Sequence, residues 1–177
     1  MPKRDQTPED ELRDVMDEMP YGLYIIGSKA GGEVNAMMAD WVMQVSFVPR
    51  LVAVSFENDA RTLANVHESG VFTVNLLPQE AMEFAARFAQ PAEGSKIKGR
   101  SPEEAAKVHH KLEGVATTDS ARGCPILDEA MAWLECEAEQ YVPAGDHTLV
   151  IARVLDGRVT RDAEPLTSTY TGWTYSG

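Results

Sequence analysis

The sequence is short of basic residues and cysteines, and it lacks long apolar runs. Its 177 residues carry 16 lysines and arginines against 28 aspartates and glutamates, a formal net charge of −12. Such a surface repels the phosphates of nucleic acids and anionic lipids, so neither nucleic acid nor a membrane is an expected partner. No run reaches the length of a membrane-spanning helix, and the first 14 residues lack the apolar segment of a signal peptide. We therefore expect a cytoplasmic protein.

Metal-binding and catalytic motifs are missing as well. The two cysteines, Cys124 and Cys136, have no metal-ligand spacing, so free thiols are expected, with Cys136 in the core. The adjacent His109 and His110 would point about 100° apart on a helix, which disfavours a shared metal. No nucleophile elbow, phosphate-binding loop, zinc-protease motif or dinucleotide fingerprint occurs. If the protein is an enzyme, a cofactor must carry the chemistry.

The apolar and turn patterns that are present predict many strands and few helices. Strands are expected at 21–28, 51–56, 71–77, 133–141 and 147–159, and the Gly-Gly pair at 31–32 leads into a further extended piece. Helices are expected at 7–18, 60–70 and 79–89, and a short one after Ser101. Because no regular strand–helix–strand rhythm appears, the pattern predicts an antiparallel barrel or sandwich with peripheral helices.

Two histidines and one acidic face are candidates for chemistry. His67 falls on the exposed side of a predicted helix and is interpreted as a surface residue. The strand at 133–141 alternates, which places Cys136 inward and its neighbour Glu135 on a solvated face rather than in a catalytic pair. His147 stands at the start of a strand, in "AGDH", where two interpretations remain open: simple hairpin chemistry, or a ligand contact at the rim of a barrel.

The stretch from Val34 to Arg50, "VNAMMADWVMQVSFVPR", mixes apolar residues with hydrogen-bonding side chains. With its flanks, "PYGLYIIGSKAGGEVNAMMADWVMQVSFVPRLVAVSFENDARTLANVHESGVFTVNLL", it resembles the flavin reductase-like, FMN-binding split-barrel family. The similarity continues through "AMEFAARFAQ", "GCPILDEAMAWLECEAEQYVPAGDHTLVIARV" and "PLTSTYTGW". The resemblance implies a mainly β, antiparallel Greek-key split barrel with peripheral α-helices over residues 20–177, after a helical extension at residues 1–19. It also implies a homodimer with flavin sites near the subunit interface.

The resemblance further implies which residues bind the flavin. The ribityl–phosphate end is expected to meet Asn35, Ala36, Met37 and Met38. The isoalloxazine ring is expected to meet Trp41, Val42, Met43, Gln44 and Val45, with Ser46 close by. The phosphate is expected to meet Asn58, Arg61, Thr62, Ser95 and Lys96. Arg50 either adds a cation near this site or faces solvent.

As for activity, the resemblance implies a flavin-dependent oxidoreductase. It would take hydride from NADH or NADPH onto FMN, with FAD as the alternative flavin, and His147 would contact the nicotinamide or the flavin face. The electrons would pass to free flavin, to a partner monooxygenase or another redox protein, or to a metal complex. The alternative is a non-enzymatic FMN-binding electron-transfer protein on the same fold.

Overall fold

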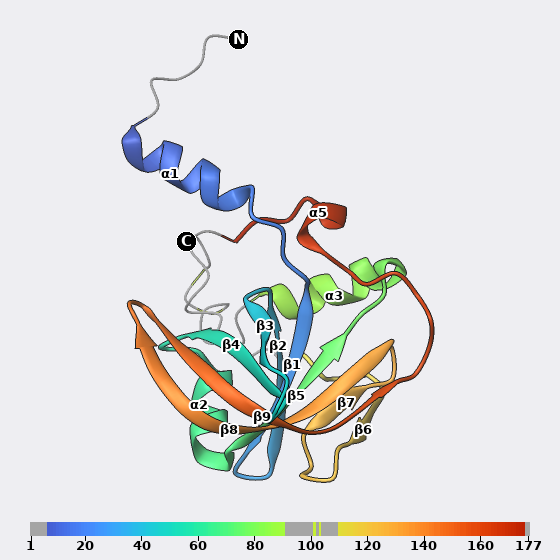
Figure 1. The fold of residues 1–177 in the computed structure, drawn as a ribbon. Coiled ribbons are helices and arrows are strands. Elements are labelled where there is room, and N and C mark those ends of the chain that lie inside the picture. The colour runs from blue at the N-terminus through green and yellow to red at the C-terminus, as the bar shows by residue number, and fades with distance from the viewer. Residues whose placement is uncertain (1–6, 91–100, 102, 104–109, 176–177) are drawn as a thin grey trace.

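In the computed structural model, which describes residues 7–90, 101, 103 and 110–175, seven strands form one antiparallel sheet (Figure 1). Its order is β2-β1-β5-β8-β9-β4-β3. The strands are β1 (Tyr24–Ala30), β2 (Glu33–Ala39), β3 (Val42–Ser46), β4 (Leu51–Glu57), β5 (Val71–Leu76), β8 (Ala132–Ala144) and β9 (His147–Val159). A small ribbon pairs β6 (Thr117–Asp119) with β7 (Pro125–Leu127).

Helices lie around this sheet rather than between its strands. They are α1 (Pro8–Asp17), α2 (Arg61–Ser69), the 3₁₀ turn η1 (Gln79–Ala81), α3 (Met82–Ala89) and α5 (Ser168–Thr171). The predicted fold class, a mainly β antiparallel Greek-key split barrel with peripheral helices, is confirmed. None of the helices that the structure describes is long and apolar enough to cross a membrane.

The sheet is closed by a very short connection. β2 and β3 stand at opposite ends of the strand order, yet only Asp40 and Trp41 separate them in the chain. The sheet must therefore curl until its two ends meet. Trp41 marks the meeting point, because its carbonyl accepts a hydrogen bond from the Ser55 N–H on β4 at 3.0 Å. We call the place where β2 and β3 meet without pairing the seam.

The interior of the curled sheet is filled by β-branched and aromatic side chains. Phe56 and Phe72 meet edge to face with ring centroids 6.2 Å apart, and both are fully buried. A second cluster, around Leu77, Phe88 and Leu166, fills the space between the sheet and α3. Two such clusters account for the strongly apolar strands, since strands buried on both faces need apolar residues throughout.

The two cysteines are free and Cys136 is buried, as predicted, and Cys124 is buried as well. Cys136 belongs to the interior cluster of the curled sheet. The Sγ atom of Cys124 lies 3.6 Å from the carbonyl oxygen of Val71, and the side chain is fully covered.

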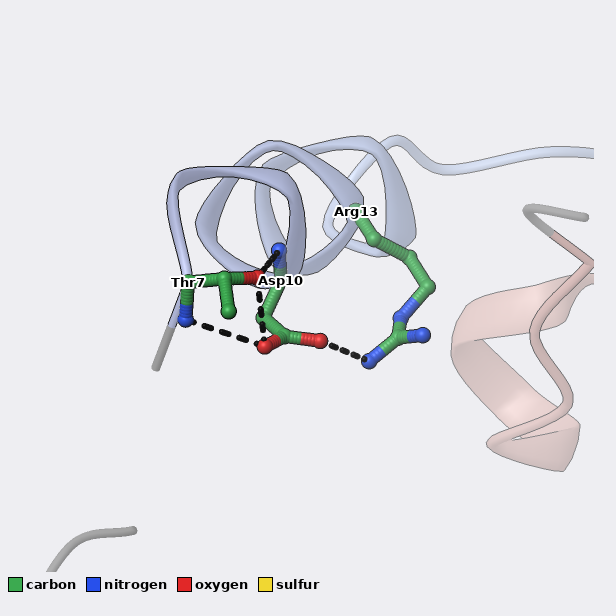
Figure 2. A network of polar contacts seen from close by, with 3 residues as sticks. All are labelled: Thr7, Asp10 and Arg13. Carbon is green, nitrogen blue, oxygen red and sulfur yellow. Dashed lines mark hydrogen bonds and ion pairs between the residues drawn. The ribbon is translucent and has the colours of Figure 1, made fainter. Parts of the chain in front are cut away.

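Helix α1 begins with a reciprocal cap (Figure 2). The Asp10 N–H donates to Thr7 Oγ1 at 3.2 Å, and the Thr7 N–H donates to Asp10 Oδ2 at 3.0 Å. Arg13 adds an ion pair to Asp10 at 3.1 Å. Because α1 buries none of its residues, these local bonds carry most of its stability.

The predicted helices and strands appear at nearly the predicted bounds, with one correction. Glu135, predicted to face solvent, is only 2% exposed and accepts the Arg122 N–H at 2.8 Å. The pairing of β8 with β9 shifts register between Glu135 and Cys136, so two successive side chains are buried. The short helix expected after Ser101 falls mostly outside the described residues, and the division of the chain at residue 19 stays a prediction.

Adding a methyl group at Gly27 tests the tight contact between β1 and the β6–β7 ribbon. A Cβ there would lie 2.4 Å from both the Pro125 carbonyl oxygen and Thr73 Oγ1, which are themselves hydrogen-bonded at 2.6 Å. We expect Gly27→Ala to lower the free energy of unfolding in urea by about 1–3 kcal/mol. Gly22→Ala is the control, because its nearest neighbour is the terminal hydroxyl of the Tyr24 side chain, which can rotate away. Equal losses in the two variants would contradict the steric explanation.

Candidate functional site

A cavity of about 590 Å³ opens at the seam. Its walls come from the end of β2, the Asp40–Trp41 connection, β4, the start of α2, the end of α3, the start of β9 and the segment after α5. Clefts of this size, mainly apolar with a few polar groups, are typical binding sites for cofactors and small ligands. Since each wall comes from a different part of the chain, the cavity exists only once the barrel has closed.

The apolar lining consists of flexible and aromatic side chains, chiefly Met37, Met38, Trp41, Phe88 and Trp173. Methionine adapts its shape to a ligand, and aromatic rings offer flat surfaces for another ring. Met37 and Met38 also pack on the two different core clusters. The rigid core therefore holds the side chains that face the cavity.

Trp41 carries an unused hydrogen-bond donor. Its Nε1 atom is buried and has no partner among the described residues. A buried N–H without a partner costs about 1–3 kcal/mol, so such a group in a cavity wall indicates a ligand that accepts the bond. The Trp41 ring also lies 4.8 Å from the His147 ring, at an interplanar angle of 44°.

His147 is the first residue of β9, and neighbouring polar groups fix its position. Its Nδ1 lies 2.7 Å from Asp146 Oδ1, and its side chain is 11% exposed. Asn58 ties the preceding turn to the end of β4: its Nδ2 donates to the Gly145 carbonyl at 3.1 Å, and its Oδ1 accepts from Thr148 at 2.8 Å. The ring is therefore held at the rim of the cavity, where the sequence interpretation of a ligand contact would place it.

Carboxylates lie close to this corner. Asp40 lines the cavity, and burial raises the pKa of its carboxyl, although backbone hydrogen bonds and His147 oppose the shift. Glu57 at the end of β4 pairs in register with His147, and its carboxylate accepts a hydrogen bond from the Tyr175 hydroxyl. The cavity is therefore acidic at the end that contains the histidine.

Another part of the lining, at the start of α2, offers groups that suit an anion. Ala60, Arg61 and Thr62 form the start of α2 and line the cavity, and no side chain that the structure describes caps this helix. Free N–H groups at a helix start favour a negative charge. Arg61 pairs with Glu33 at 2.9 Å, and Thr62 Oγ1 accepts from Asn35 Nδ2 at 3.0 Å.

Lys111 is a cavity residue that the sequence analysis missed. Its side chain is 8% exposed, and its Nζ donates to the Phe88 carbonyl oxygen at 3.1 Å. Burial lowers its pKa from 10.5 to about 8, so the amine is still mostly charged at neutral pH. No sequence motif marks this lysine, because it reaches the cavity from a connection far from β2 in the chain. Asp40, Glu57 and Tyr175 were likewise not predicted as site residues.

The structure brings some of the predicted residues together and leaves others apart. Six of the residues predicted to bind cofactor line the cavity, as does His147: Asn35, Met37, Met38, Trp41, Arg61 and Thr62. Ala36 is fully buried behind it, and Asn58 uses its side chain in the bonds described above. Ser95 and Lys96 lie outside the described residues. All of these assignments stay predictions.

The remaining predicted residues lie on β3, away from the cavity lining. They are Val42, Met43, Gln44, Val45 and Ser46. Met43 is 63% exposed, and the Gln44 Nε2 donates to the Ser46 carbonyl at 3.2 Å. In the single chain, β3 therefore presents an open edge. Arg50, after the turn, is exposed and does not line the cavity.

Comparison with known proteins identifies the class to which this barrel and cavity belong. Residues 16–174 match the family model "Flavin reductase like domain". The NADH-dependent FMN reductase AsuE2 of Streptomyces nodosus subsp. asukaensis is 33% identical over 144 residues, covering 81% of this chain and 71% of that protein. The solved structure of the flavin reductase PheA2 in its native state has a TM-score of 0.72 and 28% identity, covering 91% of this chain and 93% of the other. The chain belongs to the flavin reductase-like domain family.

Some relatives are much longer than this chain. The "Putative diflavin flavoprotein A 3" of Nostoc sp. (strain PCC 7120 / SAG 25.82 / UTEX 2576) is 30% identical over 165 residues, which cover 90% of this chain but 26% of that protein. The chain spans about a quarter of the length of the diflavin flavoproteins that it matches. The domain is therefore found both in proteins of similar length and within larger flavoproteins.

The buried amine of Lys111 predicts a characteristic pH dependence of stability. Its pKa is lowered on folding, so between pH values of about 8 and 10.5 this amine binds more protons in the unfolded chain than in the folded one. Its contribution to the free energy of unfolding therefore rises with pH in this window, by up to about 1.4 kcal/mol per pH unit, while the raised pKa values of Cys124 and Cys136 act in the opposite direction above about pH 9. We expect Lys111→Met to be more stable than the wild type below pH 8, and this difference, measured by urea unfolding at each pH, to shrink across the window.

Arg158→Met, which removes an exposed cation on β9 that does not line the cavity, is the control and should show the wild-type dependence. If the free energies of unfolding of the wild type and Lys111→Met changed with pH in parallel, the conclusion that burial destabilises the Lys111 ammonium would be contradicted.

Proposed function

We propose that this chain is an NAD(P)H-dependent flavin reductase-like oxidoreductase that holds FMN in the seam cavity. The hydride would come from NADH or NADPH, and the electrons would leave to free flavin, a partner monooxygenase or a metal complex. The family membership and the NADH-dependent FMN reductase among the relatives support this activity. The cytoplasmic location expected from the sequence is part of the same proposal.

The observation that carries the proposal is the composition of the cavity lining, which combines apolar and aromatic side chains with cations and an uncapped helix start. A flavin needs contact on its ring faces, hydrogen bonds at its ring edge and a cationic or helix-start site for its phosphate. Methionines and aromatic rings supply the apolar contact. The uncapped start of α2, with Arg61 and Lys111 on the same cavity, suits a phosphate. The residues present therefore fit the cofactor.

Bound FMN would supply the redox chemistry that the side chains lack. The protein's part is positioning. Met37, Met38 and Trp41 exclude water from the ring, and Arg61 with Thr62 fixes the phosphate end. His147, held by Asp146 and by the turn that Asn58 fastens, defines where the nicotinamide approaches. Holding two rings in one geometry lowers the barrier by removing their freedom to move apart.

The relatives also favour a second candidate. In the diflavin flavoproteins the matching region is about a quarter of the protein, so the domain in them works next to other parts of the chain. A domain of this kind can receive electrons from a redox protein instead of a nicotinamide. The second candidate is therefore an FMN-binding electron-transfer protein on the same fold.

Anaerobic addition of NADH or NADPH separates the two candidates. We expect the purified protein to show the yellow absorption of oxidised flavin and to bleach when either nicotinamide is added. We expect His147→Ala to keep its flavin and to bleach about tenfold more slowly, as after the loss of one positioning contact. Stopped-flow absorbance measures both rates, and His67→Ala is the control, because His67 lies on α2 outside the cavity lining and stacks on Tyr141. A protein that binds no flavin contradicts both candidates. If the protein binds flavin but neither NADH nor NADPH reduces it, the reductase is excluded and the electron-transfer protein remains.

We propose further that two copies associate through the open edge of β3. The strand and the turn after it expose four large apolar side chains: Met43, Val45, Phe47 and Val48. Phe47 and Val48 are 83% and 92% exposed. An unpaired edge with apolar side chains readily pairs with another chain. A second copy would cover the residues of β3 that the resemblance assigns to the flavin ring.

Phe47→Asp tests this association. We expect it to convert a dimer to a monomer at micromolar concentration, because each copy would lose about 1.5–3 kcal/mol of apolar burial and gain a desolvated charge. Light scattering after size exclusion measures the mass. Val159→Asp is the control, since Val159 is 73% exposed at the far end of β9. A wild-type monomer, or a Phe47→Asp dimer, would contradict the proposal.

A further inference from the structure

We propose that Tyr175 occupies the place of the hydride donor's nicotinamide ring and must move off the Trp41–His147 corner before the donor binds. This inference rests on the proposed function and adds to it a residue that sets the affinity for the donor. The corner is the end of the cavity formed by Trp41, His147 and Glu57.

The contacts of Tyr175 place its ring against both aromatic residues of the corner. The centroid of the Tyr175 ring lies 5.5 Å from that of Trp41, at 60°, and 6.5 Å from that of His147, at 74°. The hydroxyl donates a hydrogen bond to Glu57 Oε1. Glu57 pairs in register with His147, so the bond fixes the tyrosine over the start of β9. Tyr175 thus covers the histidine that the proposed function assigns to the nicotinamide.

The segment that carries Tyr175 is attached well on one side and weakly on the other. Trp173 packs on the cluster of Leu77, Phe88 and Leu166, and Gly172 ends α5 at a φ of 69°. Tyr175 itself remains 44% exposed. Its hold on the corner consists of one hydrogen bond to an exposed carboxylate and two edge-type ring contacts. Trp173 therefore anchors the segment, while Tyr175 can leave without disturbing the core.

The corner also contains a hydrogen-bond donor, Trp41 Nε1, for which Tyr175 provides no acceptor. The Tyr175 hydroxyl bonds to Glu57, and the buried Trp41 Nε1 next to the ring keeps no partner. An aromatic ring that carries a hydrogen-bond acceptor would satisfy both the flat surface and the N–H. The carboxamide oxygen of nicotinamide is such an acceptor, whereas the hydroxyl of Tyr175 lies at Glu57 and leaves Trp41 Nε1 without a partner among the described residues. The corner is therefore better matched to the donor than to Tyr175.

Competition of this kind weakens the apparent affinity for the donor. A ligand that binds only the open form has its dissociation constant multiplied by the inverse of the open fraction. A net hydrogen bond and an aromatic pair together amount to about a tenfold preference for the closed form. Removing the ring should therefore tighten donor binding by about that factor and leave the rate at saturation unchanged.

The experiment measures binding of NAD⁺, which cannot reduce flavin, to the flavin-containing protein by calorimetry. We expect Tyr175→Ala to lower the dissociation constant about tenfold, and Tyr175→Phe, which loses only the hydrogen bond to Glu57, to lower it about threefold. The KM for NADH should fall in the same order, with kcat unchanged. Tyr170→Ala is the matched control, because Tyr170 is 52% exposed on α5 and does not line the cavity.

Unchanged or weaker NAD⁺ binding by Tyr175→Ala overturns the inference, since Tyr175 would then be indifferent to the donor or a fixed wall of its site. Flavin-containing Tyr175→Ala that binds no NAD⁺ overturns it too, while flavin binding still stands. A protein that purifies without flavin and takes up none contradicts the proposed function itself. The two failures are therefore told apart by the flavin content of the sample.

Discussion

The rest of the structure depends on the two-residue connection between β2 and β3. A sheet whose end strands are joined by Asp40 and Trp41 alone cannot stay open. It curls, and its ends meet edge to edge without forming a ladder of hydrogen bonds. A fully paired barrel would fill this position with backbone bonds, whereas the seam leaves it free for side chains. The cavity thus exists because a covalent connection, and not a ladder of backbone hydrogen bonds, joins the two end strands.

The seam also explains why the cavity walls differ so much in character. Strand ends supply packed methionines and an indole, the start of α2 supplies an uncapped helix end, and loops supply charged groups. The cations and the carboxylates of the lining come from different elements. Arg61 comes from α2 and Lys111 from a connection, whereas Asp40 comes from the β2–β3 connection and Glu57 from β4. A ligand that combines a phosphate with a neutral ring system matches this mixed lining.

Much of the fold could be predicted from the sequence, because its strands and helices have strong local patterns. Three examples are the Gly-Gly turn, the continuous apolar run of β4 and the glycine at the end of α2. Each can be recognised from a few consecutive residues. Glu135 could not be predicted, because a register shift in β8 overrides the alternation on which the prediction depends. The site was predicted only in part for a related reason. Met37, Met38 and Trp41 belong to one recognisable stretch, but Lys111 and Tyr175 join them only through long-range closure that no local pattern encodes.

The burial of both cysteines has a consequence for where electrons can go. Burial raises the pKa of Cys124 to about 11 and that of Cys136 to about 12, with Glu135 adding to both shifts. At neutral pH neither thiol ionises appreciably, and the thiolate is the form that reacts with oxidants and disulfides. The chain therefore contains no thiol that could compete with a bound cofactor for reducing equivalents. Electrons on a bound flavin would therefore not be diverted to a thiol of this chain.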